Sequence, residues 1–133
     1  MAKRVAPPKL PRPTDGELAI LRVLWERGPS TVREVMEELN RAEPTGYTTV
    51  LKLLQIMTDK GLVQREESGR QHVYEPTLTQ DQTQRQIVEH VVDRAFGGAA
   101  HKLVLQALSA RKAAPAELAE IRRLLNEIEK GAQ

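Results

Sequence analysis

The sequence of 133 residues contains no cysteine and only four aromatic residues, which are Trp25, Tyr47, Tyr74 and Phe96. Without cysteine there can be no disulfide, no thiolate metal site and no cysteine nucleophile, as is typical of proteins in a reducing cytoplasm. With so few aromatic side chains, the core must be aliphatic and thin. Small cores of this kind often depend on a partner chain for their stability.

Long apolar stretches are also missing. The longest run of apolar residues, Leu18 to Leu21, is far too short for a membrane-spanning helix or for the hydrophobic part of a signal peptide. We therefore expect a soluble cytoplasmic protein without membrane insertion.

Motifs for catalysis or metal binding are absent as well. The histidines His72, His90 and His101 are scattered, and none has a second ligand at the i+4 spacing that a helical metal pair uses. The chain has no glycine-rich phosphate loop and no serine elbow, and Gly97-Gly98 alone is a helix break. We predict that the protein is not an enzyme and that it has no catalytic residues, no metal site and no cofactor.

The net charge of +2 is small, so the distribution of charge is more informative than its sum. Residues 1–13 contain four basic residues, four prolines and no acid. Because proline removes a backbone donor and disfavours helix in the residue before it, this composition predicts a flexible basic arm. The arm is either a plain disordered tail or a contact to DNA phosphates.

Residues 14–77 are predicted to form the first ordered domain. Two capping-box patterns, Thr14-Asp-Gly-Glu17 and Thr31-Val-Arg-Glu34, mark the starts of two short helices, and a third helix runs from Tyr47 to Lys60. Each helix has one apolar stripe. Three such stripes can be buried only against one another, which predicts a small three-helix core.

The predicted third helix has one face for burial and one for contact. The three-and-four spacing of a buried face is kept by Val50, Leu53, Leu54 and Met57. The opposite face carries short hydroxyls, an amide and a cation, and such side chains reach phosphates and base edges in a major groove. An ordinary amphipathic surface helix has the same spacing. The neighbouring segments must therefore decide whether this helix is a DNA-recognition helix or an ordinary surface helix.

Two short strands are predicted after the third helix, Leu62 to Glu67 and Arg70 to Glu75, around a turn at Ser68-Gly69. A basic hairpin beside a DNA-reading helix is the wing of a winged helix-turn-helix domain. The long connection from Arg41 to Gly46 also favours this variant over a tight-turn helix-turn-helix. The residues predicted to bind DNA are Tyr47, Thr48, Thr49, Lys52, Gln55, Arg65, Arg70 and His72.

Residues 78–130 are predicted to form a helical dimerisation domain, which makes the fold class mainly α with a small β-hairpin. One helix ends at Phe96-Gly97-Gly98, a short one follows from His101 to Ser109, and Pro115 begins the last. Their apolar stripes favour pairing with a second copy over packing back on the winged domain. The predicted dimerisation residues are Leu103, Val104, Leu108, Leu118, Ile121, Leu125 and Ile128.

The chain resembles the penicillinase-repressor family in the order and spacing of several motifs between Asp15 and Glu129. These motifs are Tyr47-Thr-Thr-Val50, Lys60-Gly-Leu-Val63, Gly69-Arg70 and Phe96-Gly-Gly98. The resemblance implies a homodimeric bacterial winged-helix repressor whose third helix reads a palindromic operator in duplex DNA. Some members are cleaved by a β-lactam-responsive membrane protease, so the resemblance also implies a sensor protease as a partner.

The chain departs from the family pattern at one point. Gln106-Ala107 stands where the antibiotic-responsive members carry the Asn-Phe bond that their protease cuts, and the missing aromatic removes an anchor for an enzyme pocket. Release from DNA would then depend on cleavage elsewhere or on a different signal.

A different class of function also remains open, that of a helical adaptor which uses the winged domain to bind another protein. Such a binding face should offer large apolar anchors, and the polar face of the third helix offers none apart from Tyr47.

Overall fold

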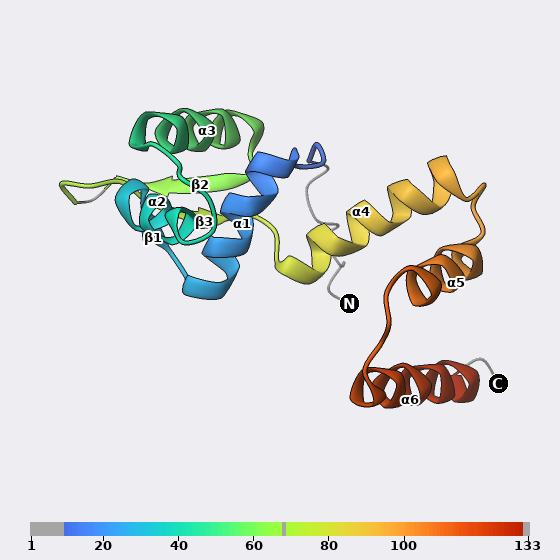
Figure 1. The fold of residues 1–133 in the computed structure, drawn as a ribbon. Helices are drawn as coiled ribbons and strands as arrows, with labels where there is room; N and C mark the ends of the chain where they lie inside the picture. Colours follow the sequence, from blue (N-terminus) through green and yellow to red (C-terminus); the bar gives the residue numbers. More distant parts are fainter. Residues whose placement is uncertain (1–9, 68, 132–133) are drawn as a thin grey trace. The chain divides into compact units, whose positions relative to one another are not determined.

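The computed structural model describes residues 10–67 and 69–131. The elements follow the order α1 (Asp15–Arg27), β1 (Ser30–Thr31), α2 (Val32–Asn40), α3 (Tyr47–Lys60), β2 (Val63–Glu66), β3 (Val73–Pro76), α4 (Gln80–Ala95), α5 (Ala100–Ala110) and α6 (Pro115–Gly131) (Figure 1). The fold is mainly α with one small antiparallel sheet of strand order β1-β3-β2. The chain divides into two compact units, one up to Val88 and one from Glu89, and the division falls within α4. The functional limits 14–77 and 78–130 stay a prediction.

The capping boxes predicted for the first two helices are both present. The Thr14 hydroxyl accepts the Glu17 N–H at 3.2 Å, and the Glu17 carboxylate accepts the Thr14 N–H at 2.9 Å. Thr31 and Glu34 make the same exchange at 3.2 and 2.9 Å. Each box satisfies two backbone donors that a helix start leaves without partners, so these local sequences determine where α1 and α2 begin.

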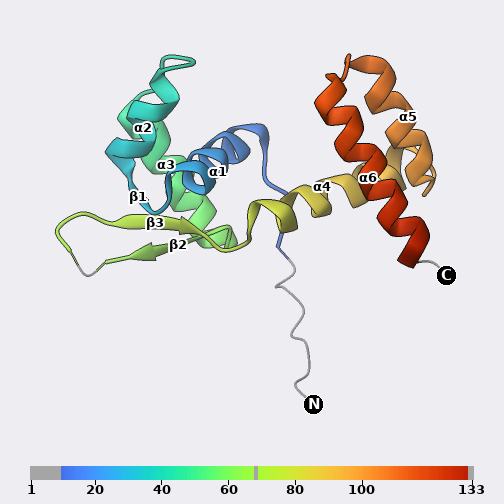
Figure 2. The same ribbon diagram turned by 90° about the horizontal axis from the view of Figure 1, so that it is seen from below.

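The three N-terminal helices bury their apolar stripes against one another, as predicted. Figure 2 shows α1, α2 and α3 grouped beside the β2–β3 hairpin. The fully buried aliphatic residues come from all three helices and are Ile20, Leu24, Val35, Val50, Leu54 and Met57. Burying one such side chain contributes roughly 1.5–3 kcal/mol to stability. Tyr74 on β3 is the aromatic member of the same core.

The sheet differs from the predicted hairpin in two respects. First, β1 adds a third strand, in which Ser30 pairs with Tyr74 and Thr31 with Val73. A strand of two residues is too short to show alternation, so the sequence pattern could not indicate it. Second, β3 begins at Val73, not at Arg70, because the last rung of the ladder pairs Val73 with Glu66. Ser68 of the predicted turn lies outside the described residues.

The start of the described chain is anchored to the first unit. Residues 1–9 of the predicted basic arm lie outside the described residues. Leu10 packs against the core, and its carbonyl accepts a hydrogen bond from the Gln86 side chain at 2.5 Å. Gly61, with φ of 82°, lies so close that a Cβ there would be 3.2 Å from Leu10 Cδ2. A side chain at position 61 would therefore be strained by both its backbone angle and this contact.

A buried ion pair joins the start of α1 to the end of α3. Glu17 is 1% exposed, and Lys60 Nζ lies 2.8 Å from its carboxylate. Burial raises the pKa of Glu17, but hydrogen bonds from Lys60 and Thr14 outweigh that effect and hold the pKa below its ordinary value of 4.5. The carboxylate therefore stabilises the helix start and the contact between two helices at once.

The helices of the C-terminal half begin with recognisable local signals. Thr79 and Gln82 exchange hydrogen bonds at 2.9 and 3.1 Å at the start of α4. Gly97 and Gly98 both have positive φ, of 58° and 85°, where the chain turns from α4 to α5. Neither α5 nor α6 has a buried residue. Most of their apolar side chains are therefore exposed in the single chain, and the rest are only half-buried.

Candidate nucleic-acid interface

The third helix presents a polar face to solvent. Thr48, Thr49, Lys52 and Gln55 are all exposed, while Val50, Leu54 and Met57 on the other face are buried in the core. Burial of one face holds the helix in place and fixes which side chains point outward. The predicted contact residues of this helix are thus available to a partner, and they offer donors, acceptors and one cation.

Two of the three predicted basic residues of the β2–β3 hairpin lie in the loop between its strands. Because β3 begins at Val73, Arg70 and His72 lie in the connection between the strands, and both are exposed. Their side chains are free of the constraint that a strand ladder would impose. The wing therefore presents a loop with two basic residues close to the start of α3.

Arg65 is held within the hairpin itself. The Arg65 guanidinium lies 2.5 Å from the Glu67 carboxylate, and the Arg65 backbone pairs with Tyr74 across the sheet. Hydrogen bonding with the Tyr74 side chain, together with the Glu67 charge, raises the pKa of Arg65 above its ordinary value. Of the three predicted wing residues, Arg65 is the one whose charge is already balanced inside the wing.

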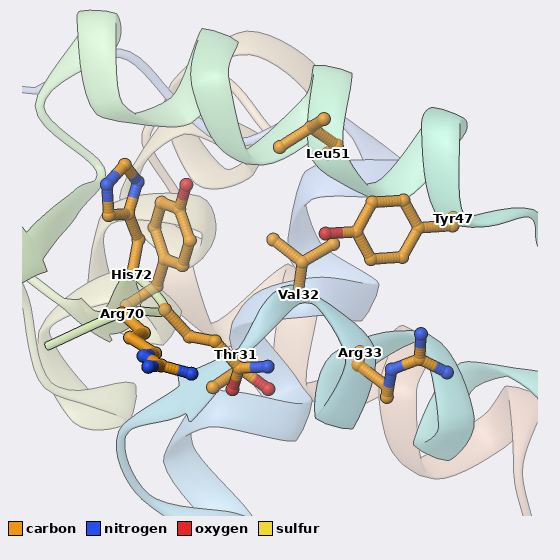
Figure 3. Close-up of a pocket in the computed structure, with 9 residues that line it drawn as sticks. Thr31, Val32, Arg33, Tyr47, Leu51, Arg70 and His72 are labelled. Atoms are coloured by element: carbon orange, nitrogen blue, oxygen red, sulfur yellow. The ribbon is translucent and has the colours of Figure 1, made fainter.

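A cleft of 260 Å³ lies between the start of α2, the start of α3 and the wing loop, and it is called the α2–wing cleft below (Figure 3). It brings together three of the predicted contact residues, Tyr47, Arg70 and His72, and leaves out the other five. The remaining lining residues are Thr31, Val32, Arg33, Leu51, Gln71 and Tyr74. Arg33 was not among the predicted contact residues, because only the packing of the wing loop opposite the start of α2 places it in the cleft.

The predicted dimerisation residues form an apolar stripe that the single chain leaves largely uncovered. Leu125 and Ile128 are 52% and 58% exposed, and Val104 and Leu108 are exposed as well. Leu103, Leu118 and Ile121 are half-buried. Exposed apolar stripes of this kind mark surfaces that bind another protein.

The described residues offer no cluster of side chains that could hold a metal ion. Within 10–67 and 69–131, no three His, Cys, Asp or Glu side chains come close enough together to hold a metal ion. None of the helices in this part of the chain has the length and apolar character needed to cross a membrane.

Comparison with known proteins gives consistent matches over most of the chain. The family model described as penicillinase repressor matches residues 13–127. The transcriptional regulator BlaI of Mycobacterium tuberculosis strain H37Rv is 33% identical over 124 residues, which are 92% of this chain and 89% of that protein. The penicillinase repressor of Bacillus licheniformis is 24% identical over 119 residues, which are 90% of this chain and 93% of that protein.

Among solved structures, monomeric Bacillus licheniformis BlaI in complex with the blaP half-operator is 27% identical, with a TM-score of 0.48. The match covers 55% of this chain and 89% of that one. The family match over residues 13–127 and the 33% identity to a regulator of nearly equal extent lead to one conclusion. The chain belongs to the penicillinase repressor family of transcriptional regulators.

Proposed function

We propose that this protein is a homodimeric transcriptional repressor of the cytoplasm that binds a palindromic operator in duplex DNA. In this proposal α3 enters the major groove, and the wing loop contacts the flanking backbone. The observation that carries it is the exposed polar face of α3, formed by Thr48, Thr49, Lys52 and Gln55 on a helix whose other face is locked in the core. The matched relatives named as transcriptional regulators or repressors support the same role.

The proposed homodimer is supported by the uncovered stripes of α5 and α6. Neither helix has a buried residue, and their exposed leucine and isoleucine side chains are most economically covered by a second copy of the same stripe. A two-fold dimer places two α3 helices on the DNA. The operator should then contain two inverted half-sites about one or two helical turns apart.

The proposal is tested by replacing Lys52 with alanine. If Lys52 neutralises a phosphate in each half-site, its loss should lower the affinity and reduce the slope of log K against log salt by about 0.9 for each contact. The measurement is a gel-shift titration at several salt concentrations with duplexes selected from a random-sequence pool by the unaltered protein.

Gln55→Ala provides the contrasting variant, because an amide reads bases and carries no charge. It should cost roughly 1–3 kcal/mol at one position of each half-site and leave the salt slope unchanged. Unaltered protein that shows no salt-dependent binding to any duplex would refute the proposal. Capture of a protein partner by α3 would then favour the adaptor function.

We also propose that release from DNA does not use the bond between Gln106 and Ala107. Both residues lie inside α5, so a protease would have to unwind the helix to reach the bond. The methyl group of Ala107 also gives an enzyme pocket no aromatic anchor. Mass spectrometry of the protein from β-lactam-treated native cells should find no fragment ending at Gln106, whereas such a fragment would overturn this proposal.

A further inference from the structure

The α2–wing cleft brings together two arginines and a histidine, and one of the arginines, Arg33, was not among the predicted contact residues. Arg33 comes from the first turn of α2, and Arg70 and His72 come from the wing loop. Figure 3 shows Arg33 and Arg70 on either side of Val32, with the Tyr47 hydroxyl pointing toward Val32 between them. None of the described residues that line the cleft is acidic.

These basic side chains have no internal partner among the described residues. Arg33, Arg70 and His72 take part in none of the ion pairs that the described residues form with one another. The nearest acid along the chain, Glu34, is already engaged, because it pairs with Arg27 at 2.7 Å and closes the Thr31 capping box. The charge in the cleft is therefore available to an external anion.

The remaining lining groups narrow the class of anion. Val32 and Leu51 give the cleft an apolar side, and the Tyr47 and Thr31 side chains carry hydroxyl groups. The volume of 260 Å³ is several times the roughly 30 Å³ that one water occupies. A phosphodiester fits this combination, because its charged oxygens need cations and hydroxyl donors while its sugar can lie on apolar side chains.

We infer that the α2–wing cleft holds one backbone phosphate of the bound duplex in each half-site, with Arg33 as a DNA contact in addition to those predicted from α3 and the wing. The inference rests on the proposed function, because it requires DNA to approach the face shared by α3 and the wing loop. Tyr47 then contacts the same phosphate through its hydroxyl. The DNA backbone bound in the cleft would then lie between the base-reading helix α3 and the wing loop.

The test compares Arg33→Gln with Arg22→Gln. Both variants remove one positive charge, but Arg22 is an exposed residue of α1 that does not line the cleft. In salt titrations with the selected duplexes, Arg33→Gln should reduce the slope of log K against log salt by about 0.9 for each half-site contact. Arg22→Gln should leave the slope unchanged.

A second measurement locates the phosphate. The duplexes carry a neutral methylphosphonate at one backbone position at a time. At one position per half-site, this change should lower the affinity of the unaltered protein but should not lower the affinity of the Arg33→Gln variant. Equal slopes for Arg33→Gln and Arg22→Gln would overturn the inference. The inference would also be overturned if amide chemical shifts showed saturable binding of inorganic phosphate in the cleft while no methylphosphonate position behaved in this way. If Lys52→Ala changes the slope while Arg33→Gln does not, the proposed function stands and only the cleft inference fails.

Discussion

Replacing both Leu125 and Ile128 by aspartate should give a chain whose first unit stays folded, that no longer self-associates and that binds a two-half-site operator about 10²–10⁴-fold more weakly. Both side chains are more than half exposed in the single chain, so their loss should not damage the fold of one copy. Two added carboxylates would repel their equivalents across a two-fold interface. The loss of affinity is large because a dimer binds its second half-site at a high effective concentration.

The matched control is Arg123→Glu, which changes the net charge by the same two units on α6. Arg123 makes a surface pair with Glu120 at 4.0 Å. Sedimentation should show a monomer for the double aspartate variant and a dimer for the control. Both proteins should bind a single half-site as the unaltered protein does. A dimer that persists in the double variant would mean that the self-association surface lies elsewhere.

Replacing Glu17 by alanine should lower the free energy of unfolding of the first unit by about 2–4 kcal/mol. The substitution removes the acceptor of the Thr14 N–H and the partner of Lys60 in one step. Breaking a fully buried ion pair costs more, but the Lys60 side chain is 34% exposed and can regain water. Urea unfolding followed by circular dichroism measures the difference.

The pH dependence of a Glu17→Gln variant separates the charge from the packing. Because the folded-state pKa of Glu17 is lowered below 4.5, its stabilising effect is fully present above pH 4.5 and is lost as the pH falls through the folded-state pKa. The stability difference between the unaltered protein and Glu17→Gln should therefore be constant near neutral pH and shrink in acid. Glu37→Gln, on the exposed surface of α2, should show no comparable difference. A difference that grows in acid would contradict the assignment.

The elements that depend on local signals were predictable from the sequence. The limits of α3 agree with the predicted Tyr47 to Lys60, because its apolar spacing and the terminal Gly61 are both local features. Both capping boxes were predictable for the same reason. The family was predictable because its motifs keep their order and spacing along the chain.

The features that were missed depend on residues far apart in the sequence. Glu17 and Lys60 are separated by 43 positions, and a capping-box glutamate is ordinarily exposed, so nothing local indicated its burial. The strand β1 exists only because β3 lies beside it. Arg33 became a candidate contact only when the wing loop was found across the cleft from it. Each case required the packing of one segment against another.

The uncovered C-terminal helices also bear on how much of the protein a cell must make. α5 is an 11-residue helix without a buried side chain, and isolated helices shorter than about 12–15 residues are marginal in water. In the proposed repressor, an unpaired chain would carry a fraying tail that cellular proteases can cut, and pairing would protect it. Newly made chains that stay too dilute to pair would then be degraded first. Repression would begin only above a threshold concentration of the protein. When its synthesis slows, degradation of unpaired chains would lower that concentration faster than dilution by cell growth alone.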